Sequence, residues 1–148
     1  MQVWTVFGLS FYLVPSSFSL YAERIVLVSS NYHPHYAEDL PQQGAVTEIV
    51  RQAFALQGIQ IDVVFMPFGR AIYESKQGNY TGLIAAWYDD ERVEHFLYSQ
   101  PMYLVLSKQD PRSEELMERF NRGLQQLQAS HQYRAILNRL LPEPTVEH

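Results

Sequence analysis

The sequence predicts an α/β fold built around a mostly parallel sheet. Short runs of β-branched and apolar residues alternate with segments whose apolar residues fall at helical spacing, which is the pattern of βα units. The first run, Arg24–Ser29, is almost continuously apolar, as expected of a strand that is covered on both faces. No long linker, repeat or low-complexity tract divides the chain after residue 22. We therefore expect a single domain over residues 23–148.

The order of the elements follows from these patterns and from the residues that interrupt them. Gly58, Gly78 and Pro142 stand where helices are expected to end. Asp110 and Pro111 form a predicted N-cap and first helical residue. The expected strands are residues 24–29, 61–65, 82–86 and 103–107, and the expected helices are residues 46–56, 70–77, 91–96, 110–127 and 132–141.

The charge and the cysteine content exclude several classes of function. The chain of 148 residues has 16 acidic and 11 basic residues, a formal net charge of −5, and its bases are scattered. Scattered bases cannot neutralise a row of phosphates, so we expect no nucleic-acid partner. The lack of cysteine excludes thiolate metal sites and thiol nucleophiles.

Residues 1–22 are expected to form a signal peptide rather than part of the fold. No charged residue precedes Glu23, and a Ser-rich stretch follows the apolar run Val3–Val14. This run is shorter than the ~20 residues that a helix needs to cross a bilayer. Export would place residues 23–148 in the periplasm or outside the cell. The alternative is a buried amino-terminal strand or helix.

Three loops that follow predicted strands carry the residues most suited to bind a ligand. In a parallel sheet these loops meet at the carboxyl ends of the strands, where ligands bind. Aromatic rings offer flat apolar faces, and a guanidinium matches a carboxylate with two hydrogen bonds. Such a set suits a small organic acid or an amino acid. The candidate ligand-binding residues are Tyr32, Tyr36, Phe68, Arg70, Trp87, Tyr88 and Arg92.

Each of these residues also has a purely structural interpretation. An aromatic residue such as Phe68 or Trp87 can close the end of the core, because aromatic side chains are mostly buried packing. Arg70 and Arg92 lie near predicted helix starts, and each can pair at the surface with an acid of the run Asp89–Glu91. The occurrence of such residues on three converging loops favours the ligand-binding interpretation.

The sequence offers little for metal binding or catalysis. His33 and His35 lie two residues apart, a spacing that suits a metal, but no third ligand is evident. The chain has no G-x-S-x-G elbow, no H-E-x-x-H pair and no phosphate-binding glycine loop. The acidic run Asp89–Glu91 opens a predicted helix, where acids offset the helix dipole. We therefore expect neither an enzyme nor a cofactor.

Five segments occur in the order and at the spacing of a known family. They are Tyr32–Asp39, GAVTEIVRQAFALQGIQIDVVFMPFGRAI, Gly78–Tyr88, DDERVEHFLYSQPMY and DPRSEELMERFNRGLQQLQASHQYRAILNRL. Together they resemble the extracellular solute-binding proteins of the amino-acid type, family 3, which serve ABC transporters. The resemblance implies the type II periplasmic binding fold, whose lobes are three-layer α/β sandwiches.

The resemblance also implies roles for individual residues. Arg92 matches the family's arginine for the ligand carboxylate, and Tyr32 or Tyr36 matches its first-loop aromatic residue. The family's ligand segment after the third strand falls on Ala86–Tyr88. Here that segment lacks the Ser and Thr hydroxyls that amino-acid binders usually present, which argues against an α-amino-acid ligand.

Compared with the family, the chain has a deletion. The family inserts a second lobe after the segment that DDERVEHFLYSQPMY resembles, but here Pro101 and Met102 run directly into YLVLSKQDP. We therefore expect one lobe without the second. Two lobes bury a ligand by closing on it, so a single lobe leaves half of the polar contacts to water.

The expected function is a periplasmic solute-binding protein of one lobe. It would bind a small polar or carboxylated solute, such as an amino acid, for ABC-type uptake or sensing. Its expected partners are that solute and an ABC permease or a sensor ectodomain. The alternative is a non-transport interaction or sensory module that has lost solute binding, with a homodimer as one arrangement.

Overall fold

The computed structural model describes residues 22–86, 89–99 and 103–141. The predicted signal peptide lies outside the described residues, except for Ala22. The elements are β1 (Glu23–Ser29), the 3-10 turn η1 (Pro41–Gln43), α1 (Ala45–Ala55), β2 (Ile59–Phe65), α2 (Phe68–Lys76), β3 (Gly82–Ile84), β4 (Phe96–Tyr98), β5 (Leu104–Ser107), α3 (Ser113–Ala129) and α4 (His131–Leu140). Within the described part of the chain, no helix combines the length and the apolar character needed to span a membrane.

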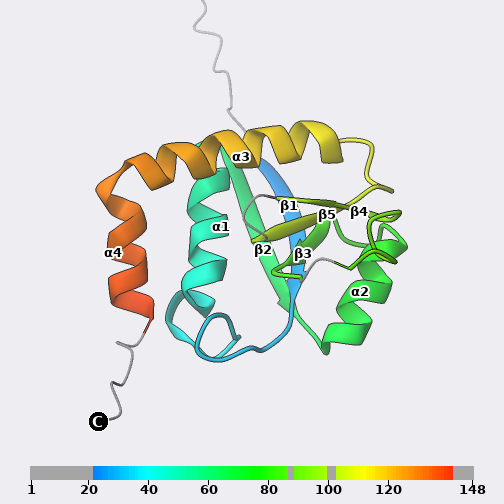
Figure 1. Cartoon of the computed structure of the whole chain (residues 1–148), viewed down its shortest axis with the longest axis horizontal. Coiled ribbons are helices and arrows are strands. Elements are labelled where there is room, and N and C mark those ends of the chain that lie inside the picture. The colour runs from blue at the N-terminus through cyan, green and yellow to red at the C-terminus, as the bar shows by residue number, and fades with distance from the viewer. Residues whose placement is uncertain (1–21, 87–88, 100–102, 142–148) are drawn as a thin grey trace, which may run out of the picture.

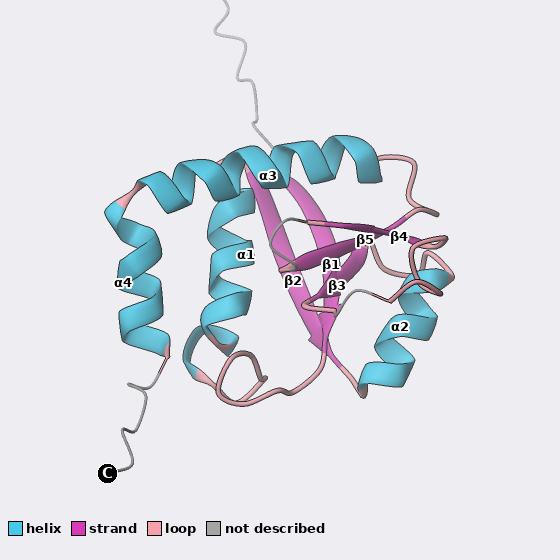
Figure 2. Ribbon diagram, viewed as in Figure 1, coloured by secondary structure: helices cyan, strands magenta, loops and turns pink. Residues whose placement is uncertain are grey.

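The strands form one five-stranded sheet in the order β2-β1-β3-β5-β4 (Figure 2). β1 pairs in parallel with β2 and β3, whereas β5 pairs antiparallel with both β3 and β4. Only β5 therefore runs against the others. The predicted α/β fold with a mostly parallel sheet is confirmed.

Helices cover both faces of the sheet, which makes a three-layer sandwich (Figure 1). On one face, α1, α3 and α4 pack over Ile25, Leu27 and Leu106. On the other face, the side chains of α2 pack over Val28 and Leu83 in a smaller cluster. The two clusters take alternate residues of the same strands, as the period of two in a strand requires.

The continuous apolar character of β1 reflects its central place. β1 has a hydrogen-bonded neighbour on each edge, and Leu27 and Val28 are fully buried on opposite faces. A strand in this position cannot slide by one residue, because the slip would exchange its two buried faces. The carboxyl end of β1 is thereby fixed beside that of β2.

Two predictions about local structure are wrong. Residues 91–96 do not form a helix; a single turn, with the Phe96 N–H on the Arg92 carbonyl at 3.0 Å, leads into β4. Phe96 is buried and pairs with Ser107 of β5, so tertiary pairing overrides the helical pattern. α3 begins at Ser113 rather than after Asp110, because a turn occupies the three residues before it.

The turn before α3 is stabilised by Asp110. Its carboxylate accepts hydrogen bonds from the backbone N–H of Arg112 at 2.9 Å and from the Arg112 guanidinium at 2.8 Å. The hydrogen bonds from Arg112 hold the pKa of the Asp110 carboxyl below its usual value of 3.8, against the opposing effect of burial. A lowered folded-state pKa means that the charged carboxylate stabilises the fold at neutral pH. This contribution is lost as the pH falls through the folded-state pKa.

We expect Asp110→Asn to lower the free energy of unfolding by about 1 kcal/mol at pH 7. The difference from the wild type should shrink below about pH 4, where the Asp110 carboxyl of the unfolded wild-type chain begins to bind a proton and that of the folded chain follows at lower pH. Urea unfolding at pH 7 and at pH 3 measures both values. As a control, Asp62→Asn removes an exposed ion pair with Arg24 and should cost less than about 0.5 kcal/mol. A difference that is equal at the two pH values would contradict this account.

α1 and α3 approach closely at Gly123. A Cβ atom on Gly123 would overlap the backbone carbonyl oxygen of Ala53 in α1. The side chain of Gln57 lies near the same point. Two helices can come this close only where one presents a bare Cα, so Gly123 sets the position of α3 over the sheet.

We expect Gly123→Ala to lower the free energy of unfolding by about 2 kcal/mol, because the added methyl group forces the helices apart. Gly69→Ala is the matched control, since Gly69 lies in α2 with no atom near its would-be Cβ. This control should be neutral or stabilising by about 0.5 kcal/mol. Chemical unfolding measures both variants. Equal effects at the two positions would show that helix propensity, not the close approach, decides the outcome.

Candidate functional site

A cavity of about 380 Å³ lies where β1 and β2 end. The two chain segments that form it are joined, because the Met66 N–H donates to the Ser29 carbonyl at 2.9 Å. Three of the residues that line the cavity are polar or charged, and four are apolar. Its lining residues are Ser30, Asn31, Glu38, Phe65, Met66, Pro67 and Phe68. This is the edge of the sheet at which the sequence placed the ligand-binding loops.

The loop after β1 is folded back on itself. Tyr32 and Tyr36 pair through their backbones, with the Tyr32 N–H donating to the Tyr36 carbonyl at 2.6 Å and the reverse bond at 3.0 Å. Gly44 has a φ of 93° and lies so close to His35 and Tyr36 that a Cβ would collide with their backbone. The start of α1 therefore supports the loop directly.

A second hydrogen bond holds the loop at the cavity. The Asn31 side-chain oxygen accepts from the Glu38 N–H at 2.9 Å. This bond spans the loop and fixes two of the lining residues relative to each other. This hydrogen bond preorganises the part of the cavity formed by the loop after β1. Preorganisation reduces the entropy that is lost when a ligand binds.

Arg92 and Phe68 come together, although they are distant in the sequence. The central carbon of the Arg92 guanidinium lies 5.5 Å from the centroid of the Phe68 ring, in a cation–π arrangement. Arg92 is also 3.5 Å from the Asp89 carboxylate, and its side chain is only 26% exposed. Phe68 lines the cavity, whereas Arg92 is not one of its lining residues and is linked to it through Phe68.

The structure places the other predicted site residues differently. Tyr32 is 51% exposed and stacks on the His35 ring, with centroids 5.6 Å apart. Arg70 is exposed on α2 and forms a surface ion pair with Glu74 at 3.7 Å, a partner that the sequence analysis did not name. Neither Tyr32 nor Arg70 lines the cavity. Trp87 and Tyr88 lie outside the described residues.

Tyr36 is buried rather than open to a ligand. Its side chain is turned inward, and the hydroxyl donates to the Ala85 carbonyl at 3.5 Å. Burial raises the pKa of the Tyr36 phenol, and the nearby Tyr32 adds to the rise. The hydroxyl therefore stays protonated as a donor. Ala85 has a φ of 54°, and its N–H donates to the Tyr103 carbonyl at 2.8 Å, so both its backbone groups are held at the point where β3 ends.

His33 and His35 do not converge on one point. The Nε2 atom of His33 lies 2.8 Å from the Asp39 carboxylate, whereas the His35 ring stacks on Tyr32. Over residues 22–86, 89–99 and 103–141, no three His, Asp or Glu side chains are grouped so that they would hold a metal ion.

Several lining residues were not predicted from the sequence. Ser30, Asn31 and Glu38 carry the polar side of the cavity, and Phe65 and Met66 carry the apolar side with Pro67. Asn31 and Pro67 lie two residues after the ends of the predicted strands 24–29 and 61–65, and this position was the available signal. For Glu38 there was no such signal, because only the folding back of the loop brings it to the strand end.

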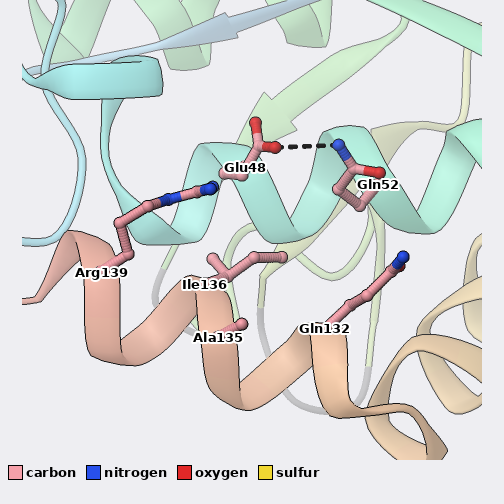
Figure 3. Close-up of a pocket in the computed structure, with 6 residues that line it drawn as sticks. All are labelled: Glu48, Gln52, Gln132, Ala135, Ile136 and Arg139. Atoms are coloured by element: carbon pink, nitrogen blue, oxygen red, sulfur yellow. Dashed lines mark hydrogen bonds between the residues drawn. The ribbon is translucent and has the colours of Figure 1, made fainter.

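A second concavity, of about 260 Å³, lies between α1 and α4 (Figure 3). Glu48 is almost fully buried beside it and is already compensated within α1, by Arg51 at 2.6 Å and by the Gln52 amide at 2.9 Å. Arg139 reaches from α4 toward α1 in this view. The other lining residues are Gln132, Ala135 and Ile136. The lining comes only from two helices, as in a seam between packed helices.

Comparison with known proteins identifies the family to which the chain belongs. Residues 25–143 match the family of bacterial extracellular solute-binding proteins, family 3. The chain therefore belongs to this family, which is one of solute-binding proteins. A search of curated proteins found no significant sequence match.

Solved structures share the fold at low sequence identity. Substrate-binding domain 2 of GlnP from Lactococcus lactis, in an open conformation, has a TM-score of 0.66 and 14% identity over 80% of this chain and 95% of that one. A histidine kinase sensor domain similar to periplasmic binding proteins has a TM-score of 0.66 and 12% identity over 81% and 97%. The arginine-bound form of domain 1 from TmArgBP has a TM-score of 0.58 and 17% identity over 70% of this chain and 93% of that one.

The structure has a short connection where the resemblance places a second lobe. Residues 99–103 alone join β4 to β5, which are neighbours in the sheet. At the end of this connection, the hydroxyl groups of Tyr103 and Tyr133 lie 2.7 Å apart, which ties α4 to the start of β5.

Proposed function

We propose that the protein is a solute-binding protein that takes a small polar or carboxylated solute, such as an amino acid, into the cavity beside Phe68. One observation carries the proposal: the Arg92 guanidinium lies over the ring of Phe68, and Phe68 lines a cavity formed by loops at the strand ends. Membership of a solute-binding family supports it.

Arg92 is suited to hold a carboxylate of the solute. A guanidinium presents a planar fork of donors that matches two carboxylate oxygens. The ring of Phe68 and the carboxylate of Asp89 hold it in one orientation, so little side-chain entropy is lost when the solute binds. Trp87 and Tyr88 directly precede Asp89 in the chain, and we propose that they also contact the solute.

A single lobe is a reasonable binding unit. A cavity that is open on one side loses the contacts that a closing second lobe would add, so we expect weak binding. The arginine-bound form of domain 1 from TmArgBP, whose fold this chain shares, is a precedent for a ligand held by one domain of this architecture. Weak binding suits a solute present at high concentration.

The biological setting of the binding is uptake or sensing. We propose that residues 1–22 are a signal peptide and that the lobe works in the periplasm, with an ABC permease as one partner. The second candidate function is sensing, in which the lobe reports a solute to a sensor protein. The histidine kinase sensor domain that has this fold supports this candidate. A homodimer that covers the open face belongs to the same alternative.

We expect a thermal-shift or calorimetric screen of amino acids and small organic acids to find a solute that binds the wild-type protein. Arg92→Ala should then weaken that binding at least about tenfold, because a charge-assisted hydrogen bond to the solute carboxylate is lost. Arg24→Ala is the matched control, since Arg24 lies near the start of β1 and forms an exposed ion pair with Asp62 of β2. Its binding should equal that of the wild type.

Two results would contradict the proposed function. One is a broad panel of solutes that leaves the melting temperature of the wild-type protein unchanged. The other is a solute that binds the folded Arg92→Ala variant as tightly as the wild type. Circular dichroism of both variants establishes that they are folded.

A further inference from the structure

One edge of the sheet, along β2, is left open. β2 is the first strand in the order β2-β1-β3-β5-β4, and among the described residues only those of β1 pair with it. Directly after β2, the Met66 N–H donates to the Ser29 carbonyl of β1. Backbone groups alternate in direction along a strand, so those of Ile61, Val63 and Phe65 turn away from β1 to the open edge. These outward groups form no hydrogen bond with the described part of the chain.

α3 lies against only the beginning of this edge. The Arg119 guanidinium of α3 donates to the Gln57 carbonyl at 2.7 Å, and Ile59, the first residue of β2, is fully buried. Beyond Ile59 the strand opens to solvent, and Val64 is 38% exposed. The free edge therefore covers residues 60–65.

This edge lacks the usual protection against pairing with another strand. Proteins protect the edges of sheets with short strands, charged residues, prolines or bulges. β4, at the other edge, has only three residues, whereas β2 has seven, IQIDVVF, without lysine or proline. Its one charged residue, Asp62, lies 2.8 Å from Arg24 of β1, so its charge is compensated within the protomer. β2 is thus suited to accept a further strand.

The open edge is complementary to a second copy of itself. A two-fold axis at Val63 places two β2 strands antiparallel, with Ile61 of each opposite Phe65 of the other and Val63 opposite its own copy. The backbone groups of these residues face the edge, so the pairs form about six hydrogen bonds. Their side chains share one face of the sheet, and pairs of aromatic and β-branched side chains stabilise antiparallel strands.

A two-fold axis one residue earlier, at Asp62, is disfavoured for two reasons. It brings the two Asp62 carboxylates directly opposite each other, and like charges in that position destabilise a pair of strands. It also places Phe65 opposite the partner's Ile59, whose backbone is buried and closed to a further strand. The axis at Val63 avoids both costs, and it sets Val64 opposite the partner's Asp62 on the other face.

We propose that the protein forms a dimer by antiparallel pairing of the β2 edges, with the two-fold axis at Val63. The two sheets then become one continuous sheet. This contact differs from a homodimer over the open face of the lobe, because it is made by the strand edge. Pairing of one short strand gives an interface below about 1,200 Å², so we expect a weak dimer with a dissociation constant of about 10–100 µM.

Two substitutions at Val64 test the contact and its register. Both remove the same exposed apolar side chain, but Val64→Lys places a positive charge opposite the partner's Asp62, and Val64→Glu places a negative one. The Lys variant should dimerise about tenfold more tightly than the Glu variant, because each pair occurs twice in the dimer. Sedimentation equilibrium of the full chain between about 5 and 500 µM measures the dissociation constants.

Tyr73→Lys and Tyr73→Glu are the matched controls. Tyr73 is 61% exposed on α2, so these variants change charge and exposed apolar surface in the same way but away from β2. Their dissociation constants should equal that of the wild type. Circular dichroism establishes that all four variants are folded.

Amide hydrogen exchange identifies the strand edge directly. The N–H groups of Asp62 and Val64 turn to β1 and should exchange slowly at every concentration. Those of Ile61 and Val63 should exchange about threefold more slowly at about 500 µM than at about 20 µM, because they are hydrogen-bonded only in the dimer.

Three results would overturn this inference. The first is a chain that stays monomeric up to about 500 µM, which leaves the proposed function intact. The second is a dimer whose dissociation constant is equal for the two Val64 variants or changes with Tyr73. The third is slow exchange of Ile61 and Val63 in the monomer, because another segment of the same chain then occupies the edge.

Discussion

The burial of β1 on both faces and along both edges is the constraint on which the rest of the structure depends. Its parallel pairing with β2 and β3 places the ends of all three strands at one edge of the sheet. The chain that leaves β1 carries Asn31 and Glu38, and the chain that leaves β2 carries Phe68. These residues meet because the strands before them cannot change register, since each face of β1 is filled by a separate cluster of side chains.

The site itself depends on a small number of interactions that hold loops in place. The Met66 N–H on the Ser29 carbonyl joins the two loops, and the Asn31 side chain fixes the backbone of Glu38. The cation–π contact between Arg92 and Phe68 then attaches a third segment, which follows β3. A lobe that does not close on its ligand needs binding residues that are already held in position. These interactions hold the loops in position.

The sequence predicted most of the fold because the deciding signals were local. The apolar run of β1 and the stripe of α3 needed no knowledge of partners. The prediction of a helix over residues 91–96 failed because Phe96 pairs with Ser107 of β5 and is buried there, and the helical spacing of these residues does not reveal that pairing. Phe68 and Arg92 were expected in the site from their place after strands, whereas Glu38 depended on how the loop after β1 folds back. The burial of Tyr36 depended on the same folded loop.

The position of the bound solute tests the central claim most directly. In an NMR titration of isotope-labelled protein with the tightest-binding solute, the account predicts that the largest shifts occur at the backbone of Ser30, Asn31, Phe68 and the segment around Arg92. Shifts concentrated instead on Gln132 and Ile136, in the groove between α1 and α4 (Figure 3), would contradict it.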